Sequence, residues 1–134
     1  MRIPRTVGIA FIALYDIYLT SQGGMTISEL AKSQQLSISY LEQIFKKLRQ
    51  RGLVVGVRGP SGGYQLAKPA AEITLANVVD VFVAPTLRPA ADEPQSKHLW
   101  HAIGRALHED LSRITIANSS RLDLIENLFD KSER

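Results

Sequence analysis

Apolar positions recur at helical spacing between residues 37 and 52. Ser37 is a good N-cap, and Gly52 stands where a helix often ends with a left-handed residue. The predicted helix between them has polar and basic side chains opposite its apolar face, as a helix that enters a DNA major groove requires. A solvated surface helix shows the same pattern, so the neighbouring segments must decide. The apolar face consists of Leu41, Ile44, Phe45 and Leu48, and the outward face of Ser39, Gln43, Lys46 and Gln50, with Glu42 beside it.

The segment before this helix predicts a second, shorter helix. Thr26 and Glu29 have the spacing of a capping box, in which each side chain satisfies the backbone N–H of the other residue. The apolar spacing of Ile27, Leu30 and Ala31 follows, and the helix is expected to end near residues 33–36. Two helices joined by a tight turn, the second longer and more basic, indicate a helix-turn-helix.

A β-hairpin is predicted directly after Gly52. Residues 53–57 are β-branched and bounded by glycine, and residues 63–66 alternate in the same way across a Gly-Pro-Ser-Gly tip. Arg58 at the base of the tip is placed to reach a minor groove or a phosphate. A surface hairpin is the alternative, but the predicted hairpin follows the helix over 37–52 with no spare residues, which favours the wing of a winged helix.

The remaining chain is expected to be helical. Apolar spacing and turn residues predict four further helices and one loop. They are a buried helix over about residues 4–21, a short helix capped by Thr74, an exposed proline-rich loop at 84–95, a long helix over 97–114 and a final helix over 121–130. The fold class is therefore mainly α with a small β-hairpin. We expect a winged helix-turn-helix domain over residues 1–83, a loop over 84–96, and a dimerisation helix with a C-terminal helix over 97–134.

Charge is unevenly distributed along the 134 residues, although the formal net charge is only +3. Residues 1–70 contain nine Lys and Arg against three Asp and Glu, and residues 71–134 contain seven against ten. A basic half and an acidic half indicate that one part meets a polyanion. The apolar run after Arg2 and Arg5 imitates a signal peptide, but Asp16 interrupts it and no cleavage site follows, so a cytoplasmic protein is expected.

Five short motifs make the chain similar to a known family: Tyr40-Leu41-Glu42-Gln43, Leu48-Arg49, Gly52-Leu53-Val54, Val57-Arg58-Gly59-Pro60 and Gly62-Gly63-Tyr64. They resemble the signature of the Rrf2 (Rrf-two) family of bacterial winged helix-turn-helix transcription regulators, which includes IscR-like, NsrR-like and CymR-like members. The resemblance is dense over residues 26–66 and looser elsewhere. One departure is Arg5-Thr6-Val7-Gly8-Ile9, where the family usually has a Lys-Gly-Arg-Tyr-like segment.

The resemblance implies a homodimer that binds double-stranded DNA. Ser39 and Gln43 are expected at base edges, Glu42 at a cytosine amino group, and Lys46 at phosphate. The full predicted DNA-binding set is Arg2, Arg5, Thr26, Ser37, Ser39, Tyr40, Glu42, Gln43, Lys46, Arg58, Gly59, Pro60 and Ser61. The long-helix stripe predicted to join two copies is Leu99, Trp100, Ile103, Leu107, Leu111 and Ile114, with packing inside one domain as the alternative.

The chain has no cysteine, whereas cluster-binding members hold iron and sulfur with three of them. The position of the histidine ligand in IscR-like members is Lys97 here, and the acidic ligand of NsrR-like members falls near Gly8. We therefore expect no iron–sulfur cluster and no other cofactor. Whether cysteines are absent by nature or by engineering is left open by the sequence.

The sequence gives little support for a metal site or for catalysis. His101 and His108 are two helical turns apart, roughly 10 Å, too far to share a metal ion within one chain. No nucleophile and base are paired in a recognisable motif, so an enzyme is not expected. The predicted function is transcription regulation on a palindromic operator, with a partner protein or small molecule as effector. The rival is a protein-interaction module that no longer reads DNA and acts with a partner enzyme.

Overall fold

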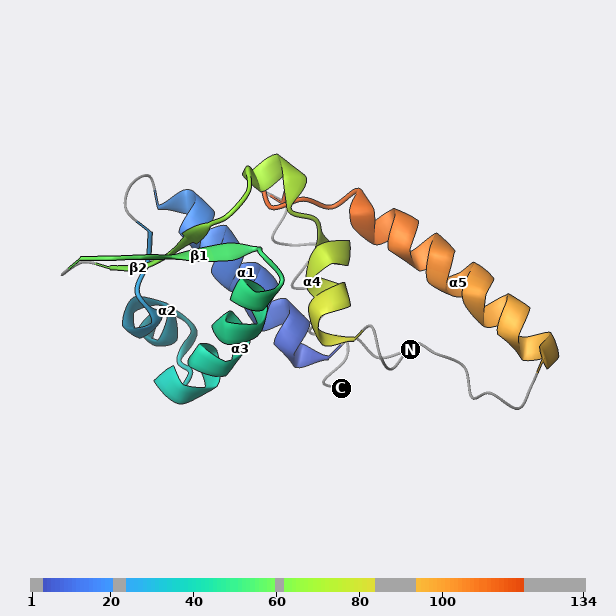
Figure 1. The fold of residues 1–134 in the computed structure, drawn as a ribbon, viewed down its shortest axis with the longest axis horizontal. Coiled ribbons are helices and arrows are strands. Elements are labelled where there is room, and N and C mark those ends of the chain that lie inside the picture. The colour runs from blue at the N-terminus through green and yellow to red at the C-terminus, as the bar shows by residue number, and fades with distance from the viewer. Residues whose placement is uncertain (1–3, 21–23, 60–61, 84–93, 120–134) are drawn as a thin grey trace.

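The computed structural model describes residues 4–20, 24–59, 62–83 and 94–119. Helices make up most of this part of the chain, and a two-stranded antiparallel hairpin extends from one side (Figure 1). The order of elements confirms the expected fold class. They are α1 (Arg5–Leu19), α2 (Ile27–Gln34), α3 (Ile38–Gln50), β1 (Val54–Val57), β2 (Gly63–Leu66), the 3-10 helix η1 (Ala70–Glu72), α4 (Leu75–Phe82) and α5 (Pro94–Ser112).

Local capping explains where α2 and α3 begin. Thr26 Oγ1 accepts the Glu29 backbone N–H at 3.1 Å, and the Glu29 carboxylate accepts the Thr26 N–H at 3.0 Å. Ser37 Oγ accepts the Tyr40 N–H at 3.1 Å at the start of α3. Both predicted caps are therefore confirmed. Between the helices, Gln35 adopts a left-handed conformation with φ 55°, which makes the tight turn.

Gly52 ends α3 in the way its sequence position predicts. Its φ is 72°, its N–H donates to the carbonyl of Arg49, and the Leu53 N–H donates to the carbonyl of Leu48, each at 3.0 Å. This double hydrogen bond satisfies two of the free carbonyls at the helix end. The chain is thereby turned directly into β1, which pairs with β2 from Val54 opposite Leu66 to Val57 opposite Gly63.

The residue just before the N-cap of α2 also pairs with the hairpin, through a single antiparallel bridge. The backbone N–H and C=O of Met25 pair with those of Tyr64 at 3.0 and 2.8 Å. A side chain on Gly63 would overlap with the carbonyl of Met25, so only glycine permits this approach. The pairing ties β2 to the residues just before α2.

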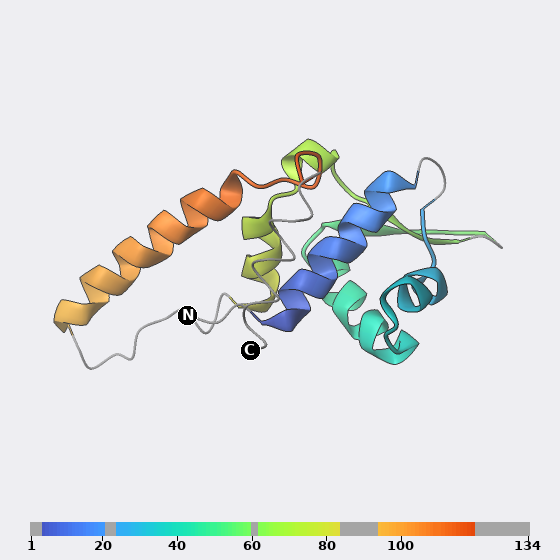
Figure 2. The same ribbon diagram turned by 180° about the vertical axis from the view of Figure 1, so that it is seen from behind.

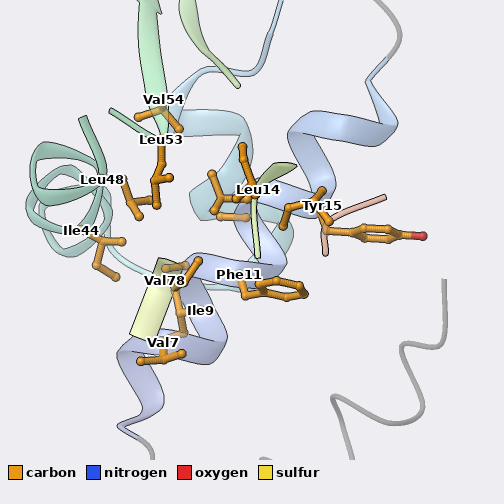
Figure 3. Packing of buried hydrophobic residues seen from close by; sticks show 14 of the residues in the cluster. Val7, Ile9, Phe11, Leu14, Tyr15, Ile44, Leu48, Leu53, Val54 and Val78 are labelled. Atoms are coloured by element: carbon orange, nitrogen blue, oxygen red, sulfur yellow. The ribbon is translucent and has the colours of Figure 1, made fainter. Parts of the chain in front are cut away.

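The core lies where α1, α3 and α4 meet (Figure 3). Phe11 and Leu14 of α1, Leu48 of α3 and Val78 of α4 are fully buried. Buried residues lie on most sides of α1, so the long apolar run of the sequence forms a core helix, as expected. In the described part of the chain, no helix combines the length and apolarity that a bilayer crossing needs.

The helix α5 differs from its prediction at both ends. It begins at Pro94 instead of Lys97, because proline is well suited to the first position of a helix, where no N–H bond is lost. It ends at Ser112, so Ile114 lies beyond it. There the chain runs back along residues 70–75, with Ile114 O accepting the Leu75 N–H at 2.8 Å and the Ile116 N–H donating to Ile73 O at 2.9 Å. We call residues 113–119 the return segment.

Several predictions lie outside the described residues. These are the final helix over 121–130, most of the loop over 84–95, and the candidate DNA contacts Arg2, Pro60 and Ser61.

Candidate nucleic-acid interface

One face of α3 is polar and open to solvent. Ser39, Glu42, Gln43 and Lys46 are all exposed, whereas the apolar face opposite them is buried. The side chains predicted to meet bases and phosphate therefore share one accessible surface. The buried face consists of Leu41, Ile44, Phe45 and Leu48, as the apolar spacing predicts.

Contacts on two flanks fix the orientation of α3. The Phe45 ring lies 4.9 Å from the Tyr64 ring of β2, measured between centroids. On the other flank, Lys47 Nζ lies 5.8 Å from the centroid of the Phe82 ring at the end of α4. The helix is thus held between the hairpin and α4, and its polar face points away from both.

The residues that cap the two helices of the helix-turn-helix can also donate a hydrogen bond to phosphate. The hydroxyl oxygens of Thr26 and Ser37 accept backbone N–H groups, which leaves each hydroxyl proton available to an acceptor outside the chain. Phosphate oxygens are acceptors of this kind. Tyr40 is half-buried and packs against the core, so its ring helps to position the first turn of α3.

The wing presents Arg58 and Gly59, both exposed, at its far end. Gly59 has φ 132°, and its carbonyl accepts the Gly62 N–H at 2.9 Å, which closes the tip. The two strands extend from the body on the side of α2 (Figures 1 and 2). Arg5, the other described arginine of the predicted set, is exposed in the first turn of α1.

The predicted dimerisation stripe, which runs from α5 into the return segment, divides into two parts. Leu99 and Ile103 are 60% and 39% exposed, whereas Leu111 is buried and Leu107 and Ile114 pack against the core of their own chain. The side chain of Trp100 lies outside the described residues. His108 Nε2 lies 3.3 Å from an Asp80 carboxylate oxygen, which links α5 to α4. The C-terminal half of α5 is thus attached to the body, and the exposed apolar positions lie in its N-terminal half.

Ile38 is a feature that the predicted site set missed. It is the first residue of α3 and is 50% exposed, between the neighbours Ser37 and Ser39. The signal in the sequence was an isoleucine in the first helical turn that falls outside the buried face.

A family model described as an iron-dependent transcriptional regulator, Rrf2, matches residues 3–125. The HTH-type transcriptional regulator IscR of Photorhabdus laumondii is 37% identical over 133 residues, which cover 95% of this chain and 80% of that protein. Among solved structures, IscR of T. potens has a TM-score of 0.74 at 28% identity, covering 90% of this chain and 87% of the other. CymR, the global cysteine regulator of B. subtilis, has a TM-score of 0.71 at 27% identity, with 91% and 98% covered.

The residues of this chain do not fit a thiolate-bound cluster. Iron–sulfur clusters are held by cysteine thiolates, and the sequence contains none. In the part of the chain that the structure describes, no three His, Asp or Glu side chains are grouped as metal ligands. His108 instead contacts Asp80.

Proposed function

Because the chain belongs to the Rrf2 family of transcriptional regulators, we propose that it binds a palindromic DNA operator as a homodimer, without an iron–sulfur cluster. The observation that carries the DNA-binding part is the exposed Ser39, Gln43 and Lys46 face of α3, held between the hairpin and α4. Such a helix matches the width of the major groove, and its polar side chains match the donors and acceptors of base edges. The proposed regulator acts in the cytoplasm and has no enzymatic activity.

In the proposed complex, each contact has a separate task. Ser39 and Gln43 bind base edges, Glu42 accepts from a cytosine amino group, and Lys46 binds phosphate. Arg58 of the wing enters the minor groove that flanks each half-site, where a narrow A·T-rich groove attracts arginine. Two copies related by a two-fold axis then read the two halves of a palindrome.

Leu99 and Ile103 support the dimer. They stand one helical turn apart on α5, and the N-terminal half of this helix projects from the body (Figure 2). Exposed apolar side chains at this spacing can be buried by the same surface of a second copy. The proposed interface is therefore concentrated in the N-terminal half of α5.

Selection of genomic fragments by the purified protein, followed by titration of a selected fragment, tests DNA recognition. Binding should weaken with salt, with a slope of about −0.9 in log K against log salt concentration for each neutralised phosphate. No enrichment of any fragment, or salt-independent binding, would favour the protein-interaction module instead.

The absence of a cluster has its own test. Protein purified without oxygen should contain no stoichiometric iron and should bind its operator equally in air and under reductant. Regulation would then come from a partner protein or small molecule that binds the DNA-competent and DNA-incompetent states unequally, with the region 84–95 as the proposed receiving segment. Iron lost together with operator affinity on exposure to air would contradict this proposal.

A further inference from the structure

Ile38 is an apolar side chain on an otherwise polar approach to α3. Its neighbours Leu36 and Tyr40 pack against the hydrophobic core, whereas Ile38 is absent from that core in the described part of the chain and is 50% exposed. The cap of α3 is made by Ser37, so the helix start does not depend on Ile38. Neither core packing nor helix capping accounts for an isoleucine at this position.

The place of Ile38 on the helix brings it to the predicted base-reading residues. It follows the N-cap directly, and Glu42 lies one turn further along on the same side of α3. The N-terminal residues of a recognition helix are those that reach base edges in the major groove. Ile38 would therefore enter the groove together with Ser39 and Glu42.

In the major groove, the 5-methyl group of thymine is the apolar feature that a side chain can recognise. We propose that Ile38 packs against a thymine methyl group and so selects a T·A pair at one position of each half-site. This inference rests on the proposed DNA-binding function and adds a specificity-determining residue to it. The polar contacts of Gln43 and Glu42 read other base pairs, and Ile38 discriminates by excluding water from one methyl group.

Replacement of each thymine of a selected operator by deoxyuridine, one position at a time, removes only the methyl group. The wild-type protein should lose about fourfold in affinity at one thymine of each half-site, the effect of one buried methyl group. Ile38→Ala removes the contact from both half-sites, so it should bind the thymine operator about sixteenfold more weakly and should show no further loss on the deoxyuridine operator. Its unfolding temperature should match that of the wild type, because Ile38 is not part of the core.

Leu19→Ala is the matched control. Leu19 is 59% exposed, and Figure 1 places the C-terminal end of α1 away from the first turn of α3. This variant should retain both the operator affinity and the deoxyuridine effect. Operator binding that is insensitive to deoxyuridine at every position, or an unchanged deoxyuridine effect in Ile38→Ala, would overturn the thymine contact alone. Failure of the wild-type protein to select any operator would overturn the proposed function as well.

Discussion

Gln43 and Lys46 lie on the same exposed face of α3 but carry different chemistry. A glutamine amide offers a donor and an acceptor that can match one base, whereas a lysine ammonium binds phosphate without regard to sequence. In the proposed DNA complex, the two residues therefore separate specificity from general affinity in one helix.

Gln43→Ala should cost about 1–3 kcal/mol at one base position and relax the preference there. Lys46→Ala should weaken binding to all sequences and make the salt slope shallower by about one unit. Titration of operator variants at several salt concentrations measures both effects. An unchanged sequence preference in Gln43→Ala would show that the outward face is assigned incorrectly.

Gly63 and Gly52 are required for different physical reasons. A Cβ at Gly63 would overlap with backbone of Met25, whereas a Cβ at Gly52 would meet nothing within 4 Å and only the φ of 72° is unfavourable. Gly52→Ala should therefore cost about 1–2 kcal/mol of unfolding free energy. Gly63→Ala should cost about 3 kcal/mol or more, since backbone must move.

Urea unfolding of the two variants gives the comparison, with Gly56→Ala as control because a Cβ there also meets nothing within 4 Å and its φ is not positive. Equal losses in Gly52→Ala and Gly63→Ala would contradict the proposed close approach of Met25 and Gly63.

At the scale of elements, the sequence predicts those boundaries that local chemistry decides. Thr26, Ser37 and Thr74 each place a hydroxyl where a helix begins, and the structure confirms all three caps. Contacts between residues distant in sequence were not predicted. The Met25–Tyr64 pairing and the return segment depend on backbone groups, which leave no periodic pattern in the side chains.

The same limit applies to the candidate site. The outward face of α3 follows from helical periodicity and is exposed as expected. The split of the α5 stripe could not be predicted, because apolar spacing does not reveal whether the partner surface belongs to the same chain or to another copy.

The flank of α3 that contacts α4 offers a direct test of element packing. An ammonium group over an aromatic ring at an exposed site contributes about 0.5–1 kcal/mol. A double-mutant cycle of Lys47→Met and Phe82→Leu should therefore give a coupling free energy of this size in unfolding experiments. The matched cycle with Lys46→Met in place of Lys47→Met should give none, because Lys46 lies on the outward face. Equal coupling in both cycles would argue against the Lys47–Phe82 contact.

Asp16 introduces a pH dependence into α1. Burial raises the pKa of its carboxyl above the ordinary value of 3.8. The folded chain therefore holds this proton more tightly than the unfolded chain, and the stability contributed by Asp16 falls as pH rises from 3.8 through the raised pKa. Asp16→Asn should raise the unfolding temperature near neutral pH, and the gain should shrink as the pH is lowered through this window. A gain independent of pH would show that desolvation of the carboxylate is not the cause.

At the scale of the whole molecule, the two halves of α5 differ in their contacts with the rest of the described chain. Its C-terminal half is linked to α4 by His108 and Asp80, and its N-terminal half carries the exposed Leu99 and Ile103 away from the body (Figures 1 and 2). In the proposed dimer, this geometry sets the distance between the two α3 helices, and hence the spacing of the half-sites.

Replacement of Leu99 and Ile103 by glutamate should convert the proposed dimer to a monomer, because two like charges would face their copies across the two-fold axis. Sedimentation measurements read out the mass, and operator titration should show a parallel loss of affinity. Leu19→Glu, which is also an exposed position, should remain dimeric. A double variant that stays dimeric would exclude this half of α5 as the interface.

The return segment has a consequence for building hybrid regulators. Ile116 is fully buried, and its backbone and that of Ile114 complete hydrogen bonds to Ile73 and Leu75, so residues far along the chain finish the body that presents α3. Suppose that two relatives exchange residues 1–83, with the junction near residue 83. The hybrid would then contain residues 1–83 of one parent and the return segment, residues 113–119, of the other. A chimera that recognises its new operator must therefore inherit residues 113–119 from the same parent as residues 1–83.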